Sequence, residues 1–188
     1  AVAKIHHFSS QDKANTVWAF AKQELLHLPT MDAIAEESLR HMSEYSQQHI
    51  SNISWAFAKL LVKNAPLQDA ISAQALKIIP EAQPQTLSSI AWSLARHNLR
   101  DMTLLKSISA AAQASITAFG AQELSNTSWA FAILAVHDAP LCDAIADAAL
   151  RNMKTFLVLN ITNTFWALAS LSFRHEPLFD AIAEASVQ

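Results

Sequence analysis

Glycine and cysteine are almost absent from this sequence: one Gly and one Cys stand among 188 residues, beside six Pro. One glycine supplies neither the many tight turns of a β-rich protein nor a glycine-rich phosphate loop. A single thiol, Cys142, excludes a disulfide framework and any metal site that needs several cysteines. The scarce residues therefore exclude disulfide-bonded miniproteins, many-stranded β folds and phosphate-loop enzymes.

Charge and long apolar runs are also scarce. Only 15% of the residues are charged, and the formal net charge of −3 gives no overall attraction for nucleic acid. The longest apolar run, residues 129–136, falls far short of the ~20 residues that a membrane helix needs. Yet 52% of the residues are hydrophobic, too many for a disordered chain. Abundant alanine and few β-branched residues predict a soluble, all-helical protein without a membrane span.

The sequence does contain a repeat. Its five tryptophans recur at intervals of 37 residues, within the segments NTVWAFAK, NISWAFAK, SSIAWSLAR, NTSWAFAI and NTFWALAS. Asn precedes the Trp by three residues in four copies, with Ser in the third, and Pro follows it by eleven residues in the same four copies. So many positions in phase, with no insertion, indicate a tandem repeat of 37 residues.

Each repeat is predicted to hold two helices. The first runs from about eight residues before the Trp to about eight after it. The second begins at the Pro, where a missing N–H costs nothing, and Asn64, Asp101 or Asp138 caps it. It ends near the positions Tyr45, Ala82, Phe119 and Phe156. Antiparallel helix pairs stacked in register form an all-α fold, the α-solenoid.

The whole chain, residues 1–188, is predicted to be a single α-solenoid array. Its Trp-centred repeats lie near residues 9–45, 46–82, 83–119, 120–156 and 157–188. Ala1 and Gln188 both fall in the phase of a second helix, and neither end has a polar cap or a targeting sequence. We therefore expect the chain to be a fragment of a longer array, truncated within a helix at both ends.

A helical wheel separates two faces of the first helix. The position two residues after the Trp, which holds Phe or Leu, points to the core. The opposite side carries what we call the tryptophan strip: the residues seven and three before the Trp, the Trp itself, and the residues four and eight after it. The candidate RNA-binding residues of the strip are Asn15, Asn52, Ser89, Asn126, Asn163, Trp18, Trp55, Trp92, Trp129, Trp166, Lys22, Lys59, Lys63, Arg96, Arg100 and Arg174.

Two interpretations of the strip remain open. In the structural one, the Trp is wedged between repeats, the Asn binds backbone groups at the helix start, and the cations are solvated. In the functional one, successive strips line a groove for single-stranded RNA, with amides for base edges, indoles for stacking and cations for phosphates. Charge separates weakly between the helices, since the first helices sum to +2 and the rest of the chain to −5.

No catalytic constellation is apparent. The pair His6-His7 lacks a carboxylate or thiol at ligand spacing, so surface histidines are favoured over a metal site. Cys142 follows the start of a second helix, where the helix dipole lowers a thiol pKa, but no His adjoins it and an idle thiol is favoured. We predict no enzyme activity, no cofactor, no metal and no small-molecule substrate.

The repeated [ST]-N-x-x-W-A-[FL]-A followed by P-L-x-D-A-I resembles the heptatricopeptide and octotricopeptide repeat proteins of organelles, over the whole chain. The third repeat is the most divergent copy. The resemblance implies an α-solenoid that binds organellar RNA in RNA processing, stability or translation, or within a ribosome, often beside a RAP domain, which has no counterpart here. It also implies a mitochondrial or plastid location.

We therefore expect a non-catalytic module that binds single-stranded RNA. The alternative is a protein-interaction scaffold or structural subunit of a large organellar assembly, in which the Asn ladder binds an extended peptide. The period and motif favour RNA, whereas the near-neutral charge and apolar content favour the scaffold. A catalytic domain elsewhere in a longer protein stays a third possibility.

Overall fold

The computed structural model describes residues 2–185, with side chains from residue 4 to residue 184, and ten α-helices make up most of that range. The first helices of the five repeats are α1 (Ser10–Lys22), α3 (Gln47–Lys59), α5 (Pro84–His97), α7 (Ala121–Ile133) and α9 (Val158–Ser170). The second helices are α2 (Leu28–Arg40), α4 (Ala65–Ile78), α6 (Met102–Ser115), α8 (Ala139–Asn152) and α10 (Glu176–Ala185). The predicted all-α solenoid fold of paired helices is confirmed.

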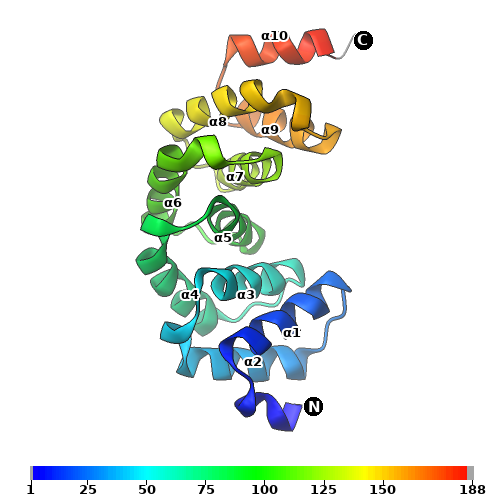
Figure 1. The fold of residues 1–188 in the computed structure, drawn as a ribbon, viewed down its shortest axis with the longest axis vertical. Coiled ribbons are helices and arrows are strands. Elements are labelled where there is room, and N and C mark those ends of the chain that lie inside the picture. Colours follow the sequence, from blue (N-terminus) through cyan, green and yellow to red (C-terminus); the bar gives the residue numbers. More distant parts are fainter. Residues whose placement is uncertain (1, 186–188) are drawn as a thin grey trace. The chain divides into compact units, whose positions relative to one another are not determined.

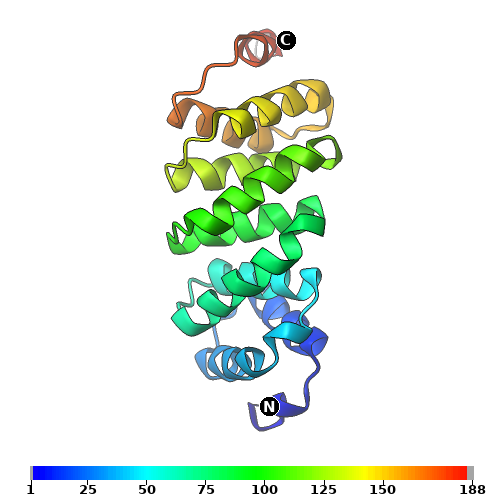
Figure 2. The same cartoon turned by 90° about the vertical axis from the view of Figure 1, so that its left-hand side faces the viewer.

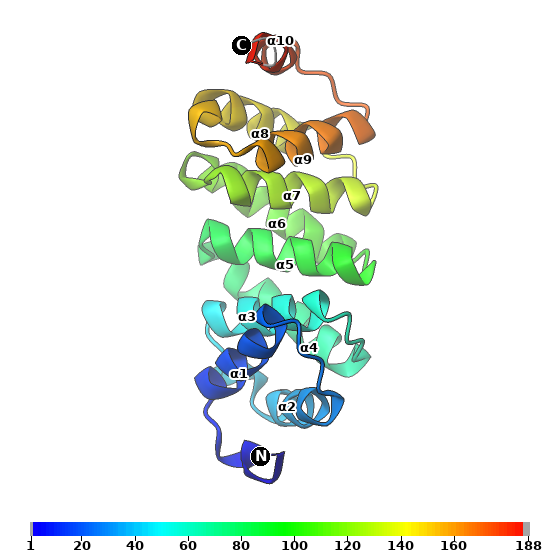
Figure 3. The same cartoon turned by 90° about the vertical axis from the view of Figure 1, so that its right-hand side faces the viewer.

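The chain divides into two compact units, residues 1–82 and 83–188, and the division falls between the second and third predicted repeats. In the first unit, α1 lies beside α3 (Figure 1). In the second unit, α5, α7 and α9 lie side by side and form one layer (Figure 3). Helices α6 and α8 form the second layer, which faces the viewer in Figure 2.

Small side chains separate the first helices of the second unit. Ser125 and Ser128 of α7 are 2% exposed, and the Asn160 side chain of α9 donates a hydrogen bond of 3.2 Å to the Ser125 hydroxyl. Thr164 and Ala167, on the α9 side that faces α7, are also buried. The wheel's core position is confirmed in this unit, because Leu94, Phe131 and Leu168 are buried.

Side-chain caps begin the second helices as predicted. The side-chain oxygen of Asn64 accepts the Leu67 N–H at 3.0 Å, and a carboxylate oxygen of Asp138 accepts the Leu141 N–H at 3.1 Å. Asp101 likewise accepts two N–H groups at the start of α6, the one second helix without a proline. Two histidines in the same phase, His27 and His175, are further caps that residue type did not predict, and their Nδ1 atoms accept N–H groups at 3.3 Å.

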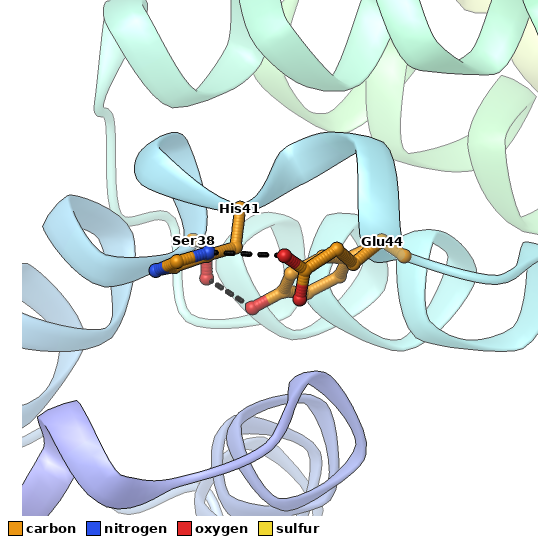
Figure 4. Close-up of polar contacts among 4 residues, drawn as sticks. Ser38, His41 and Glu44 are labelled. Carbon is orange, nitrogen blue, oxygen red and sulfur yellow. Dashed lines mark hydrogen bonds and ion pairs between the residues drawn. The ribbon is translucent and has the colours of Figure 1, made fainter.

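The second helices end close to the predicted positions. Four of them run into a short 3₁₀ turn: η2 (Met42–Glu44), η3 (Ile79–Glu81), η4 (Ile116–Ala118) and η5 (Met153–Thr155). A further 3₁₀ segment, η1 (Val2–His7), precedes α1. After α2, the Tyr45 hydroxyl contacts that of Ser38 at 2.8 Å and His41 pairs with Glu44 at 3.1 Å (Figure 4). Burial raises the pKa of Tyr45, so this hydroxyl stays protonated.

The predicted end of the first helix is wrong. We expected about eight helical residues after each Trp, but each first helix stops four or five residues after it. The residue six after the Trp has a left-handed backbone in all five repeats: Glu24 (φ 54°), Leu61 (56°), Asn98 (56°), Ala135 (50°) and Ser172 (54°). Two backbone hydrogen bonds then close each first helix. In α7, one of them runs from the Val136 N–H to the Phe131 carbonyl oxygen at 2.9 Å.

This turn also corrects the wheel. Lys63, Arg100 and Arg174, eight residues after the Trp, lie in the loop beyond the helix rather than on its face. Their directions follow from the turn and not from helical periodicity.

Replacing Ala135 by Gly is expected to raise the free energy of unfolding by about 1 kcal/mol, because a left-handed backbone is strained for Ala and not for Gly. Urea unfolding followed by circular dichroism measures the change. Ala110→Gly is the matched control: this exposed alanine lies within α6, where glycine should lower the free energy of unfolding by about 1 kcal/mol. Destabilisation by both substitutions would contradict the expected effect of the turn.

Candidate nucleic-acid interface

In each unit, the tryptophans lie at the surface of the first helices, with part of each indole exposed. Trp18 and Trp166 are 41% and 46% exposed, and Trp55, Trp92 and Trp129 are half-buried. Neighbouring indoles contact each other: the ring centroids are 6.5 Å apart for Trp18 and Trp55, and 6.3 Å apart for Trp92 and Trp129. The indoles therefore pack between repeats and still present open surface.

Four of the five Trp are preceded, three residues earlier, by an asparagine without a protein hydrogen-bond partner. Asn15 is exposed, and Asn52, Asn126 and Asn163 are half-buried. Within the described part of the chain, none of these four side-chain amides makes a hydrogen bond. Helix starts are bonded by other residues, such as Ser9 and Ser46. The structural interpretation, in which Asn binds backbone groups at the helix start, is therefore wrong.

Three of the candidate cations are already engaged by the protein. Lys59 Nζ lies 2.9 Å from Glu24 Oε1, and the hydrogen bond and charge of Lys59 lower the pKa of Glu24. The Arg100 guanidinium donates to the backbone oxygen of Ala135 at 3.2 Å. Arg174 lies 3.0 Å from Glu176 in an exposed ion pair.

The remaining cations differ from one another. The Arg96 guanidinium lies 5.6 Å from the centre of the Trp92 ring, a cation–π arrangement that holds it against the indole. Lys22 and Lys63 are exposed, and neither forms an ion pair with any residue that the structure describes. Ser89, which replaces Asn in the third repeat, is half-buried.

The strip therefore presents amides without a protein partner and partly exposed indoles, with few cations unengaged. Amides offer a donor and an acceptor side by side, which suits the edge of a base or the backbone of a peptide. The exposed glutamines seven residues before the Trp, Gln11, Gln48, Gln85 and Gln122, extend the amide series. In the fifth repeat, Leu159 takes this place and is 66% exposed.

The other candidate chemistry is not assembled into a site. Among residues 2–185, no group of three or more His, Cys, Asp or Glu side chains is placed to hold a metal ion. The His6 and His7 rings lie next to each other, tilted by 46°, with ring centroids 3.9 Å apart. None of the described helices is both long and apolar enough to cross a membrane.

Cys142 is buried in α8 at 5% exposure. Burial first, and the nearby charge of Asp138 second, raise the pKa of its thiol to about 11. These two effects outweigh the helix dipole, which would lower the pKa of the thiol. The thiol is therefore a packing group rather than a nucleophile.

A comparison with known families finds a match over most of the chain. The model of the RNA-editing substrate-binding complex 6 protein family matches residues 34–176, well over half of the chain. Among curated proteins, none matches this chain. The matched family is associated with organellar RNA, as expected, but the heptatricopeptide and octotricopeptide resemblance is not confirmed, and a plastid location has no support.

Cys142 is expected to react with a disulfide reagent at pH 8 about 100-fold more slowly than a free thiol, since a pKa of about 11 leaves very little thiolate. The thiol of the unfolded chain loses its proton near pH 9, whereas that of the folded chain keeps it up to about pH 11. The free energy of unfolding is therefore expected to fall as the pH rises from 9 to 11. Absorbance of the released reagent measures the rate, with the urea-unfolded chain as the control. Equal rates in the folded and unfolded chain would contradict burial of the thiol.

Proposed function

This chain belongs to the RNA-editing substrate-binding complex 6 protein family, and from that premise we propose that its tryptophan strip binds single-stranded RNA. We further propose that the protein is a non-catalytic helical-repeat subunit of an RNA-editing assembly, with protein partners beside the RNA. The mitochondrion is the proposed location. The family match supports each of these steps at the level of an organellar, RNA-associated complex.

The observation that carries the proposal is the set of four unpaired, in-phase amides at Asn15, Asn52, Asn126 and Asn163. Three of these amides are half-buried and Asn15 is exposed, and none of the four has a polar atom that is both fully buried and unpaired, so a base edge can reach and bond them. An indole follows each amide by one helical turn, so each repeat offers a base edge one bonding group and a base face one stacking surface. One nucleotide per repeat is the simplest register.

The partly exposed indoles favour stacking. The paired rings are tilted by 37° and 30°, with centroids 6.5 and 6.3 Å apart, so the two rings of a pair lie next to each other rather than face to face. A base would stack on the exposed part of an indole.

A protein scaffold remains the second candidate, and the cations favour it. Lys59, Arg100 and Arg174 are engaged within the chain, which leaves little charge for phosphates. In that role the amide series would bond the backbone of an extended peptide. RNA titrations distinguish the two candidates.

The double substitution Asn126→Ala and Asn163→Ala is expected to weaken single-stranded RNA binding about tenfold or more, since an amide–base pair contributes about 1–3 kcal/mol. Filter binding with a labelled 30-nucleotide RNA at low salt measures the dissociation constant. Asn152→Ala, an asparagine at the end of α8 in the second-helix layer, is the matched control and should leave binding unchanged. If the unaltered chain does not bind RNA at low salt, the scaffold is favoured instead.

Glu24→Gln is expected to strengthen RNA binding several-fold and to steepen its salt dependence by about one unit of log slope, because it frees Lys59 for a phosphate. The same titration, repeated between 50 and 200 mM salt, measures both effects. Glu36→Gln makes the same charge change at an exposed position of α2 and serves as the control. Equal effects of both substitutions would show general electrostatics rather than a phosphate site at Lys59.

A further inference from the structure

One side of α9 carries the residues that are equivalent, 37 positions later, to those with which α7 packs against α9. The bond from Asn160 to Ser125 identifies the side of α7 that faces α9, and Ser128 lies one turn further along the same side. Leu124, Ser125 and Ser128 are all buried there. The equivalent residues of α9, 37 positions later, are Ile161, Thr162 and Phe165.

Those equivalent residues line an open groove of about 630 Å³ between α9 and α10. Val158 and Trp166 also line the groove, as does Ala169, and Ile182 of α10 closes its far side. Val158 is 81% exposed and Trp166 46% exposed, whereas Phe165 is held against Phe179 of α10 with ring centroids 4.3 Å apart. Covering so apolar and open a groove is favourable, because it removes apolar surface from water.

The start of α9 extends the apolar surface. Leu157, Val158 and Leu159 are 72%, 81% and 66% exposed. The preceding repeat has Gly120, Ala121 and Gln122 at these places. Three consecutive large apolar side chains in water are unusual for a free surface and typical of a contact surface.

The packing inside the unit indicates what fits the groove. Helix α9 covers α7 with a stripe of small residues, in which Thr164 and Ala167 are buried, while α10 follows along the second layer. An incoming helix with the same stripe would cover α9 in the same way. Its indole would cover Trp166, as neighbouring indoles contact each other in the pairs above.

We propose that the groove between α9 and α10 is the docking site of a helix hairpin with this chain's own repeat pattern. The occupant has a first helix with small side chains at two positions one turn apart and an indole beside Trp166. This inference continues an interface already present between α7 and α9, and it is independent of RNA binding.

The test is a fusion that offers such a hairpin in register. A copy of residues 152–156, as the connector, and then a copy of residues 120–156 follow residue 188 of the full chain. The added first helix then carries the Thr127 and Ala130 stripe. Docking is expected to raise the melting temperature by about 5 °C over the unfused chain, because each neighbouring interface adds stability in a repeat array. Circular dichroism measures the melting temperature and the added helix content.

Ala169→Glu places a charge in the groove and is expected to abolish the rise in the fusion. In the unfused chain it should change little, since Ala169 is exposed. Ala110→Glu, on the exposed side of α6, is the matched control and should leave the rise intact. No rise, or a rise that survives Ala169→Glu, would overturn the docking site.

Sedimentation of the unfused chain over a concentration series tests the competing occupant. A single species is expected at all concentrations. Self-association that Ala169→Glu removes would identify a second copy as the occupant and overturn the assignment to a hairpin.

Discussion

Close contact between successive first helices is the constraint on which the surface of this protein depends. Ser125 and Ser128 of α7 and Thr164 and Ala167 of α9 are buried in the space between their helices. Small side chains allow the two backbones to approach closely, and a buried hydroxyl there finds a partner in Asn160.

That close contact leaves no room for an indole between the helices. Each Trp therefore projects from the open edge of its helix, and the ring centroids lie 6.5 Å apart for Trp18 and Trp55 and 6.3 Å apart for Trp92 and Trp129. The residue one turn before each Trp falls at the same edge, out of reach of any backbone group that needs a cap. Unpaired amides and half-open indoles are thus both consequences of tight packing behind them.

Periodicity predicted the parts of the structure that depend on phase alone. The helix pairs, the caps at Asn64 and Asp138 and the core position at Phe131 all follow from spacing and residue type. The end of the first helix could not be predicted in this way, because five different non-glycine residues adopt the left-handed turn there. Periodicity also did not predict that Lys13 is buried, at 3% exposure, in a place that Ile or Leu fills in the other repeats.

The partners of Lys59 and Arg100 were equally beyond a helical wheel, because they belong to other repeats. Lys59 reaches back to Glu24 and Arg100 reaches forward to Ala135, and both partners occupy the left-handed position of a neighbouring repeat. Such contacts depend on how the turns are placed in space, which a wheel drawn for one helix does not contain. The unpaired state of the asparagines has the same origin, since it depends on the distance to every possible partner.

The engaged cations have a consequence for the proposed RNA binding. A surface that neutralises few phosphates releases few counterions, so its affinity depends weakly on salt and rests on hydrogen bonds and stacking. Those contacts distinguish one base from another, whereas phosphate contacts mainly hold the strand in place. In the proposed role, this chain, with its net charge of −3, is therefore better suited to selecting an RNA than to capturing it from solution. Basic partner subunits in an assembly would supply the long-range attraction that this chain lacks.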